Sequence, residues 1–207
     1  MNFIRFHQEL KNLPIFSIKE LNKLDEKIYH HRLVEWQKKG LIERIANGVY
    51  KFSDISIDEY KLFFLGNRIY SPSYISLESA LSFYNFIPET VYSITSVTTK
   101  KTTSFNTKYG NFTYRKIKNS YFFGYSLITK ENFVIKIAEP EKAILDYLYF
   151  HSDISDLNSL SELRLNQYEI KEKIDKTKFD KYLALFNNKS LIKRAKLFIK
   201  ILEHADT

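Results

Sequence analysis

The chain has 207 residues and a mass of 24.7 kDa, which suits one larger domain or two small domains with a buried core. Its 32 Lys and Arg residues outnumber 24 Asp and Glu residues, so the formal net charge is +8. The absence of cysteine excludes disulfide bonds, thiolate metal sites and thiol nucleophiles. No apolar run reaches the roughly 20 residues of a membrane span, and the N-terminus lacks the pattern of a signal peptide. These features predict a cytoplasmic protein without a membrane partner.

The positive charge is concentrated in three parts of the chain. Residues 1–52 carry ten basic and six acidic side chains, a net charge of +4. Residues 91–130 carry seven basic side chains and no acidic one, and residues 170–207 carry ten basic and five acidic ones. Clustered basic charge favours a polyanionic partner. Only seven of the basic residues are Arg, so part of the Lys content fits the bias of an AT-rich genome.

The first fifty residues carry the pattern of three helices followed by a β-hairpin. Ser17 and Glu20 form a Ser-x-x-Glu capping box that begins the second helix. Asp25 is suited to cap the third helix, and Gly40 is placed to end it in the left-handed conformation. The Asn-Gly pair that begins at Asn47 is a strong hairpin signal. The predicted helices span 2–12, 18–24 and 26–39, and the predicted strands span 41–45 and 49–52.

After a polar break over 53–58, the sequence mixes helix and strand patterns. Residues 76–84 carry apolar side chains at helical spacing, and Pro140 is suited to the first turn of a helix. β-Branched and aromatic runs separated by turn residues predict hairpins. The predicted helices span 58–65, 76–84, 140–151, 160–167, 178–187 and 190–203, and the predicted strands span 91–99, 112–117, 122–129 and 133–138, with a further strand before residue 109.

These patterns predict an α+β protein with two domains. The first, over 1–54, is predicted to be a winged helix-turn-helix, because paired helices are followed by a basic hairpin. The second, over 58–207, is predicted to be a mixed α/β domain with antiparallel hairpins and a tail of C-terminal helices.

The third helix and the hairpin are the predicted DNA-binding elements. In a winged helix the second of the paired helices lies in the major groove and presents its outer face to base edges. The side chains predicted to point inward are Ile28 or Tyr29, Leu33 and Trp36. The predicted contacts to double-stranded DNA are Lys27, His30, His31, Gln37, Lys38, Arg44, Asn47 and Lys51. Winged helices also serve as protein-binding modules, so docking of an acidic partner protein is the alternative.

The acid-free segment over 91–130 interleaves basic and aromatic residues on predicted strands. Such a surface can bind single-stranded nucleic acid by stacking and charge neutralisation, and it would also suit an acidic protein. The alternative is a sheet with buried aromatic rings and solvated lysines. The basic residues at issue are Lys100, Lys101, Lys108, Arg115, Lys116 and Lys118.

Catalytic and metal-binding motifs are sparse, so we predict a protein that is not an enzyme and that uses no cofactor or metal. The five glycines form no phosphate-binding loop, and no Asp-x-Asp pair suits a nucleotidyltransferase. Adjacent His30 and His31 would point about 100° apart on a helix and could not share a metal ion. Glu169 and Lys171 match the short half of an Asp…Glu-x-Lys motif, so a metal-dependent nuclease is a further alternative.

Several segments resemble the AbiEi family of antitoxins, the transcriptional regulators of type IV abortive-infection toxin–antitoxin pairs in phage defence. Two of these segments are fairly specific: YISLESAL at residues 74–81 and AEPEKAILD at residues 138–146. More generic matches lie at residues 16–21, 39–42, 48–50 and 97–100. Together they span most of residues 16–150.

The resemblance implies a winged helix that represses its own promoter by binding inverted repeats, with two protomers on the DNA. It also implies a C-terminal domain that counteracts a nucleotidyltransferase-like toxin without forming a stable complex. Glu141 and Lys142 are expected either to start a helix, where the helix dipole favours the carboxylate, or to form a surface pair used in antitoxicity. Ser76 is expected to be a helix N-cap.

Overall fold

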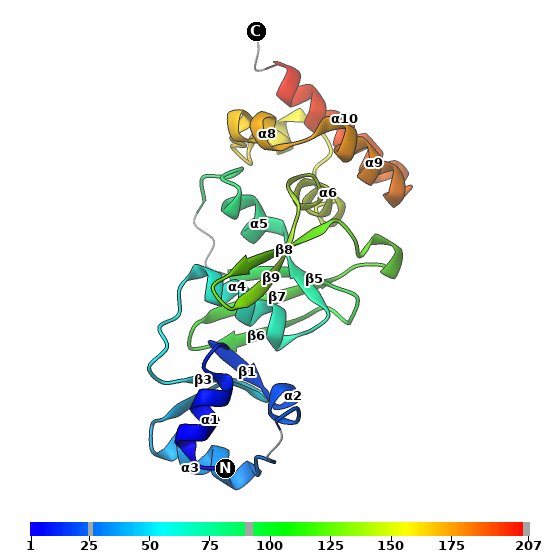
Figure 1. The fold of residues 1–207 in the computed structure, drawn as a ribbon. Helices are drawn as coiled ribbons and strands as arrows, with labels where there is room; N and C mark the ends of the chain where they lie inside the picture. Colours follow the sequence, from blue (N-terminus) through cyan, green and yellow to red (C-terminus); the bar gives the residue numbers. More distant parts are fainter. Residues whose placement is uncertain (25–26, 90–92, 205–207) are drawn as a thin grey trace.

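A computed structural model describes residues 1–24, 27–89 and 93–204 of the chain. Within these ranges the protein has ten α-helices and two β-sheets, so the prediction of an α+β fold is confirmed. Figure 1 shows an N-terminal unit at one end of the molecule, a larger sheet in the middle and the last helices at the other end. The predictions that fall outside the described residues are the cap at Asp25, the helix start at Glu26 and the strand start at Val91.

The N-terminal unit packs its helices on one face of a three-stranded antiparallel sheet. The helices are α1 (Phe3–Leu10), α2 (Ile18–Leu21) and α3 (His30–Lys38), and the strands are β1 (Ile15–Ser17), β2 (Ile42–Ala46) and β3 (Val49–Phe52). The strand order is β1-β3-β2. The capping box of Ser17 and Glu20 is confirmed, and Gly40 ends α3 with a φ of +67° as expected. The predicted hairpin β2–β3 is also confirmed, whereas β1 was not predicted.

Aromatic rings fill the core between these helices and the sheet. Phe6 of α1 stacks on Trp36 of α3 with ring centroids 4.5 Å apart, and Phe52 of β3 lies 5.6 Å from Phe6. Burying each large apolar side chain contributes roughly 1.5–3 kcal/mol. Leu33 and Trp36 point inward as predicted, which fixes the rotation of α3 about its own axis.

The opposite face of the small sheet packs against the second unit. In β3, Tyr50 and Phe52 belong to the aromatic core of the N-terminal unit. Val49 instead belongs to the core of the second unit, together with Ile15 of β1 and Ile45 of β2. The two units therefore share a continuous buried surface.

The second unit is built on a six-stranded mixed sheet. Its strands are β4 (Ser73–Ile75), β5 (Ser93–Thr98), β6 (Thr103–Thr107), β7 (Gly110–Lys116), β8 (Tyr125–Lys130) and β9 (Phe133–Ala138), with a 3₁₀ turn at Asn119–Tyr121. The order is β6-β7-β5-β4-β9-β8, in which β4 is parallel to β9 and β5 is parallel to β7. The hairpins β6–β7 and β8–β9 confirm the prediction, and the short central strand β4 was not predicted.

Helices cover both faces of this sheet. Helix α4 (Glu59–Ile69) lies toward the N-terminal unit, and α5 (Leu77–Phe83) and α6 (Pro140–Phe150) lie on the other side. The Tyr114 hydroxyl on β7 donates to the Gly66 carbonyl of α4 at 2.7 Å. A Cβ atom on Gly66 would lie 3.1 Å from Ile75 and from Ile94, so the glycine allows α4 to approach the sheet closely.

The four C-terminal helices are α7 (Leu157–Ser161), α8 (Gln167–Lys173), α9 (Lys176–Phe186) and α10 (Lys189–His204). Two of them, α9 and α10, pack on α6, and α7 packs on α10. Arg194 of α10 donates from Nε to the Leu148 carbonyl of α6 at 2.6 Å. The helix predicted over 160–167 is wrong, because Arg164 adopts a φ of +45° and Asn166 caps α8 instead. Within the described residues, no helix is both long and apolar enough to cross a membrane.

A partly buried ion pair joins the two units beside their shared core. Arg68 of α4 pairs with Glu20 of α2, and Glu20 also accepts hydrogen bonds from the backbone N–H and hydroxyl of Ser17. Burial alone would raise the pKa of the Glu20 carboxyl. The hydrogen bonds from Ser17 and the charge of Arg68 outweigh that effect and hold the pKa of Glu20 below its ordinary value.

We expect Glu20→Gln to lower the free energy of unfolding by about 1 kcal/mol near neutral pH. Because the folded-state pKa of Glu20 is lowered, its carboxylate stabilises the fold above the unfolded-state pKa. This stabilisation is lost as the pH falls through the folded-state pKa. The difference between wild type and variant in urea denaturation should therefore shrink between about pH 5 and pH 3.

The matched control is Glu172→Gln, which removes an exposed carboxylate from α8. A Glu20→Gln effect that stays constant across the acidic range would contradict a role for the charge of this residue.

Candidate nucleic-acid interface

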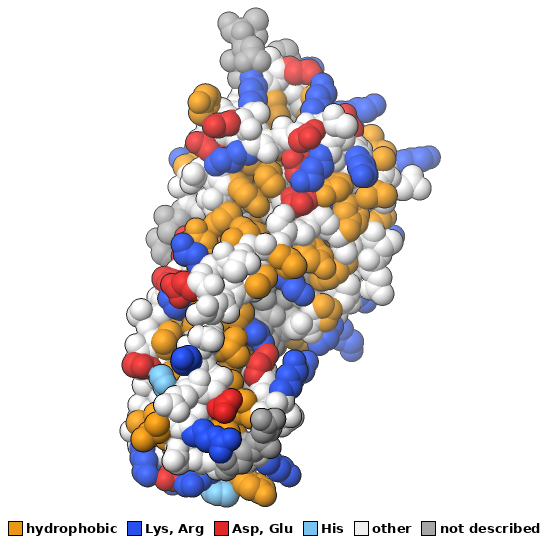
Figure 2. Space-filling model, viewed as in Figure 1, with side chains coloured by type: hydrophobic (Ala, Val, Ile, Leu, Met, Phe, Trp, Pro, Cys, Tyr) orange, Lys and Arg blue, Asp and Glu red, His pale blue; other side chains and the backbone are white. Residues whose placement is uncertain are grey.

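Helix α3 lies at the outer end of the N-terminal unit, away from the six-stranded sheet (Figure 1). His30 and His31 are exposed in its first turn, Lys38 is exposed at its last residue, and Lys27 is exposed just before it. His31 and Lys38 are seven residues apart and so share one face of the helix. Figure 2 shows basic and histidine side chains gathered at this end of the molecule. We call this group of four residues the α3 surface.

Tyr29 extends the α3 surface. Its spacing in the sequence was also compatible with an inward position. It occupies the N-cap position of α3 and its side chain is 56% exposed. Its ring stacks on His31 with centroids 5.8 Å apart, and the Lys27 ammonium lies 5.4 Å from the ring centre. Residues 27–29 are not helical, so α3 begins at His30 and Tyr29 lies just outside the helix. A cationic and aromatic group therefore stands at the beginning of α3.

Other polar side chains of α3 are already engaged within the helix. Glu35 accepts hydrogen bonds from Lys39 at 2.7 Å and from Arg32 at 2.9 Å, and these bonds hold its pKa below the ordinary value. Gln37 is half-buried and donates to the Leu33 carbonyl at 3.1 Å. The predicted contact residue Gln37 is thus less available than its histidine and lysine neighbours.

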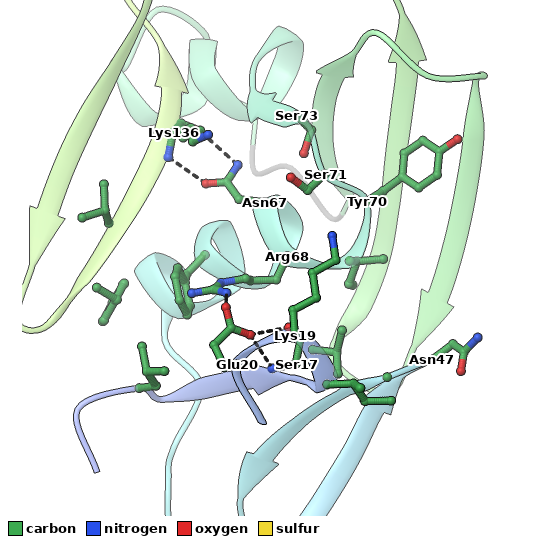
Figure 3. Close-up of a pocket in the computed structure, with 18 of the residues that line it drawn as sticks. Ser17, Lys19, Glu20, Asn47, Asn67, Arg68, Tyr70, Ser71, Ser73 and Lys136 are labelled. Atoms are coloured by element: carbon green, nitrogen blue, oxygen red, sulfur yellow. Dashed lines mark hydrogen bonds and ion pairs between the residues drawn. The ribbon is translucent and has the colours of Figure 1, made fainter. Parts of the chain in front are cut away.

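The turn of the β2–β3 hairpin borders the second unit. Arg44 is exposed and donates from Nη2 to the Asn47 side-chain carbonyl at 2.9 Å. Asn47 lines a cleft between the two units (Figure 3). Both of these predicted contacts are exposed, and Asn47 also lines the edge of the cleft.

Lys51 is buried, so the prediction that it lies outward on the hairpin is wrong. Its side chain is 3% exposed, and its ammonium donates to the carbonyls of Phe52 at 3.0 Å and Ile55 at 2.8 Å. Glu43, its cross-strand neighbour, lies 3.8 Å away. Because side chains alternate along β3, Lys51 falls on the face that packs against the second unit.

The six basic residues of the acid-free segment are divided between different places. Lys100, Lys101, Lys116 and Lys118 are exposed, and the pairing of β5 with β7 brings them near one end of the sheet. Lys108 lies at the opposite turn and forms an ion pair with Glu43 at 2.6 Å. The Arg115 guanidinium packs 5.1 Å from the Phe150 ring.

The aromatic rings of the same segment point mainly into the protein. Phe112, Tyr114 and Tyr121 are buried, and Phe105 and Tyr109 are half-buried. The Tyr109 hydroxyl donates to Glu43 at 3.0 Å. This arrangement matches the alternative of buried rings with solvated lysines and provides no open platform for stacking bases.

The two fairly specific sequence segments meet in a buried ionic network. Lys142 and Asp146, one turn apart on α6, form an ion pair with both side chains 0% exposed. The Tyr74 hydroxyl of β4 accepts from the Lys142 ammonium at 2.9 Å and donates to Asp146 Oδ2 at 2.9 Å. The Ser76 hydroxyl also donates to Asp146 Oδ2 at 2.9 Å.

This network rules out the alternative that Glu141 and Lys142 form a surface pair, whereas Glu141 does lie in the first turn of α6, as the other alternative expected. Lys142 faces the sheet, and Glu141 is buried against α9, where it accepts from the Asp175 backbone N–H at 2.9 Å. Ser76 does occupy the N-cap position of α5, but its hydroxyl does not cap that helix and binds Asp146 instead.

Burial pushes both ions of the network toward their neutral forms. It lowers the pKa of Lys142 and raises the pKa of Asp146, while their mutual attraction opposes both changes. The rings of Phe186 and Phe123 lie 4.8 Å and 5.1 Å from the Lys142 ammonium and shield it further. Since solvent reaches neither charged side chain, the network joins α6 to the sheet and offers no accessible reactive group.

The described residues hold no group of three or more His, Asp or Glu side chains placed to bind a metal ion. Glu169, from the nuclease alternative, pairs with Lys173 at 2.5 Å on α8. No protein-family model matches the chain, and no curated protein matches it either. Function is therefore inferred from the geometry of this chain.

Removing one partner of the network should cost more stability than removing both. We expect Lys142→Met to lower the free energy of unfolding by about 3–5 kcal/mol, because it leaves Asp146 buried without its counter-charge. Adding Asp146→Leu removes the stranded charge and should restore part of the stability. Urea denaturation of the single and double variants measures the difference. A double variant that is no more stable than the single one would speak against ionic coupling.

Proposed function

We propose that this protein is a sequence-specific DNA-binding transcriptional repressor whose N-terminal unit acts as a winged helix-turn-helix. The observation that carries the proposal is the α3 surface, where Lys27, His30, His31 and Lys38 are exposed at the free end of the molecule. In winged helices the corresponding helix enters the major groove. Lysine and histidine are suited to base edges and phosphates there.

The dimensions and fixed orientation of α3 support this role. An α-helix with its side chains is about 10–12 Å across, and the major groove of B-DNA is about 12 Å wide and admits one helix. Leu33 and Trp36 anchor the inner face in the aromatic core, so the outer face is held in one orientation. Tyr29 adds an exposed ring beside the cationic side chains.

The hairpin contributes less to the proposed interface than the sequence predicted. Lys51 is buried, and Asn47 lines the cleft between the units. Arg44 is the hairpin cation that is exposed. Most of the DNA contacts are therefore assigned to the α3 surface and Tyr29.

The resemblance to AbiEi antitoxins extends the proposal. We propose that the protein represses its own promoter as two protomers on inverted repeats and counteracts a nucleotidyltransferase-like toxin without a stable complex. Support comes from the two fairly specific segments, 74–81 and 138–146, which are distant in sequence but share the ionic network of Tyr74, Lys142 and Asp146. The second unit is accordingly the part to which antitoxicity is assigned.

Purified protein is expected to bind the DNA upstream of its own gene, with log K falling steeply as log salt rises, because phosphate contacts release counterions. Lys27→Ala combined with His30→Ala should weaken specific binding by about 1–3 kcal/mol for each base interaction that the variant no longer makes. Fluorescence anisotropy with a labelled upstream duplex measures both effects.

The matched control is Lys181→Gln with Lys193→Gln, which removes two exposed lysines from α9 and α10 at the other end of the molecule. This control should bind DNA like the wild type. Full affinity in the Lys27 and His30 variant would disprove the placement of DNA on α3. Absence of any binding by the wild type, with an acidic protein co-purifying, would favour the protein-docking alternative.

If the protein is an antitoxin, DNA binding by the N-terminal unit and antitoxicity of the second unit should be separable by mutation. A nucleotidyltransferase-like protein encoded next to this gene should arrest growth when expressed alone, and co-expression of this chain should relieve the arrest. The Lys27 and His30 variant should still relieve it while failing to repress a promoter reporter. Growth arrest that persists in the presence of the wild-type chain would exclude the antitoxin role and leave the repressor role intact.

A further inference from the structure

A cleft lined by both polar and apolar residues lies between the two units beside the Glu20–Arg68 ion pair (Figure 3). Its volume is about 630 Å³, within the range of small-molecule sites. The N-terminal unit lines it with residues of α2 and of the β2–β3 turn, and the second unit lines it with residues of α4, β4 and β9. Both units are therefore needed to form this site, which we call the inter-unit cleft.

The inter-unit cleft is cationic. Its basic lining residues are Lys19, Arg68, Lys100 and Lys136, and Glu20 is the one acidic residue among the described residues that line it. Glu20 is already neutralised by Arg68 and held by Ser17. Figure 3 shows Lys19 reaching from α2 into the space between Arg68 and Tyr70. A concave site with an excess of positive charge attracts anions.

Ser73 provides a second, independent observation that points to a ligand. Its side chain is 2% exposed and its hydroxyl points into the inter-unit cleft, next to Ser71 (Figure 3). Within the described part of the chain, Ser73 Oγ has no hydrogen-bond partner. Buried polar groups normally have a partner, because leaving one unpaired is unfavourable. A ligand atom in the cleft would supply that partner.

The part of the cleft formed by α4 and β9 near Ser73 is fixed by hydrogen bonds within the protein. Asn67 of α4 accepts a hydrogen bond from the Lys136 backbone N–H at 2.7 Å and donates to the Lys136 carbonyl at 3.2 Å. These two bonds fix β9 against α4 and thereby fix the start of the Lys136 side chain. The apolar side chains of Phe64, Ile69 and Phe133 line the cleft as well.

We propose that the inter-unit cleft binds a small phosphorylated molecule of about mononucleotide size. Lys19 and Lys136 supply the positive charge for the phosphate, and the Ser73 hydroxyl donates to one of its oxygens. The apolar lining covers the remainder of the ligand. Since Lys19 belongs to the N-terminal unit and Lys136 to the second unit, the bound molecule links the proposed DNA-binding unit to the rest of the protein.

Isothermal titration calorimetry of the full chain tests this site with four probes: AMP, GMP, pyrophosphate and inorganic phosphate. We expect saturable binding of at least one probe with a Kd below about 1 mM. Lys19→Gln combined with Lys136→Gln should raise that Kd about tenfold or more, because charge-assisted hydrogen bonds are the strong ones. Tighter binding of the nucleotides than of the inorganic anions would support a contribution from the apolar wall, and equal binding would support recognition of the phosphate alone.

Ser73→Ala separates ligand binding from folding. Because the Ser73 hydroxyl makes no hydrogen bond within the described residues, its removal should leave the melting temperature of the ligand-free protein unchanged or slightly higher. The Kd for the probe should nevertheless rise several-fold. The Lys181→Gln and Lys193→Gln control removes the same number of charges elsewhere and should bind the probe like the wild type.

Three results would overturn the proposal: no binding of any probe to the wild type at millimolar concentration, equal affinities of wild type and the Lys19 and Lys136 variant, or equal weakening in the control. If the Lys19 and Lys136 variant no longer bound upstream DNA, and the wild type bound none of the four probes, the cleft would be assigned to the DNA interface instead. DNA binding by the α3 surface is measured separately, so failure of the cleft proposal leaves the repressor proposal standing.

Discussion

The small sheet of the N-terminal unit is buried on both faces, and this constraint determines how the rest of the molecule is arranged. Phe16, Tyr50 and Phe52 face the helices of the N-terminal unit, while Ile15 and Val49 face the second unit. Apolar burial on both faces leaves Arg44 of β2 as the exposed cation of this sheet. The proposed contacts with partners are accordingly assigned to α3 at the outer end and to the cleft at the rim of the shared core.

The second unit depends on a different kind of interaction, an ion pair in an apolar setting. Isolated buried charges are unfavourable, so Lys142 and Asp146 must remain together and Tyr74 must complete their hydrogen bonds. This requirement fixes α6 against β4 in a single register. Two segments that are distant in the sequence, 74–81 and 138–146, thus each supply part of one network.

Local patterns predicted much of the fold, since the Ser17–Glu20 capping box, the Asn-Gly hairpin and Gly40 act over a few residues. Strands β1 and β4 are three residues long, too short for a period-two pattern to be recognised. The predicted exposure of two lysines was wrong for a physical reason. A lysine in a strand or helix pattern predicts exposure, whereas tertiary partners bury Lys51 and Lys142. The inter-unit cleft combines side chains from four or more elements, so no local pattern could have predicted it.

The position of β4 has a consequence for how the chain is made. β4 pairs with β5, which soon follows it, but also with β9, which is some sixty residues further along. On a ribosome the central sheet cannot close until β9 and α6 have emerged. Contact with the small sheet comes from α4, which emerges earlier, and before α4 appears the growing chain carries an aromatic core with Ile15, Ile45 and Val49 uncovered on its far side. A fragment of the N-terminal fifty residues alone would keep this apolar face exposed. A soluble fragment must therefore include the part of the second unit that covers it.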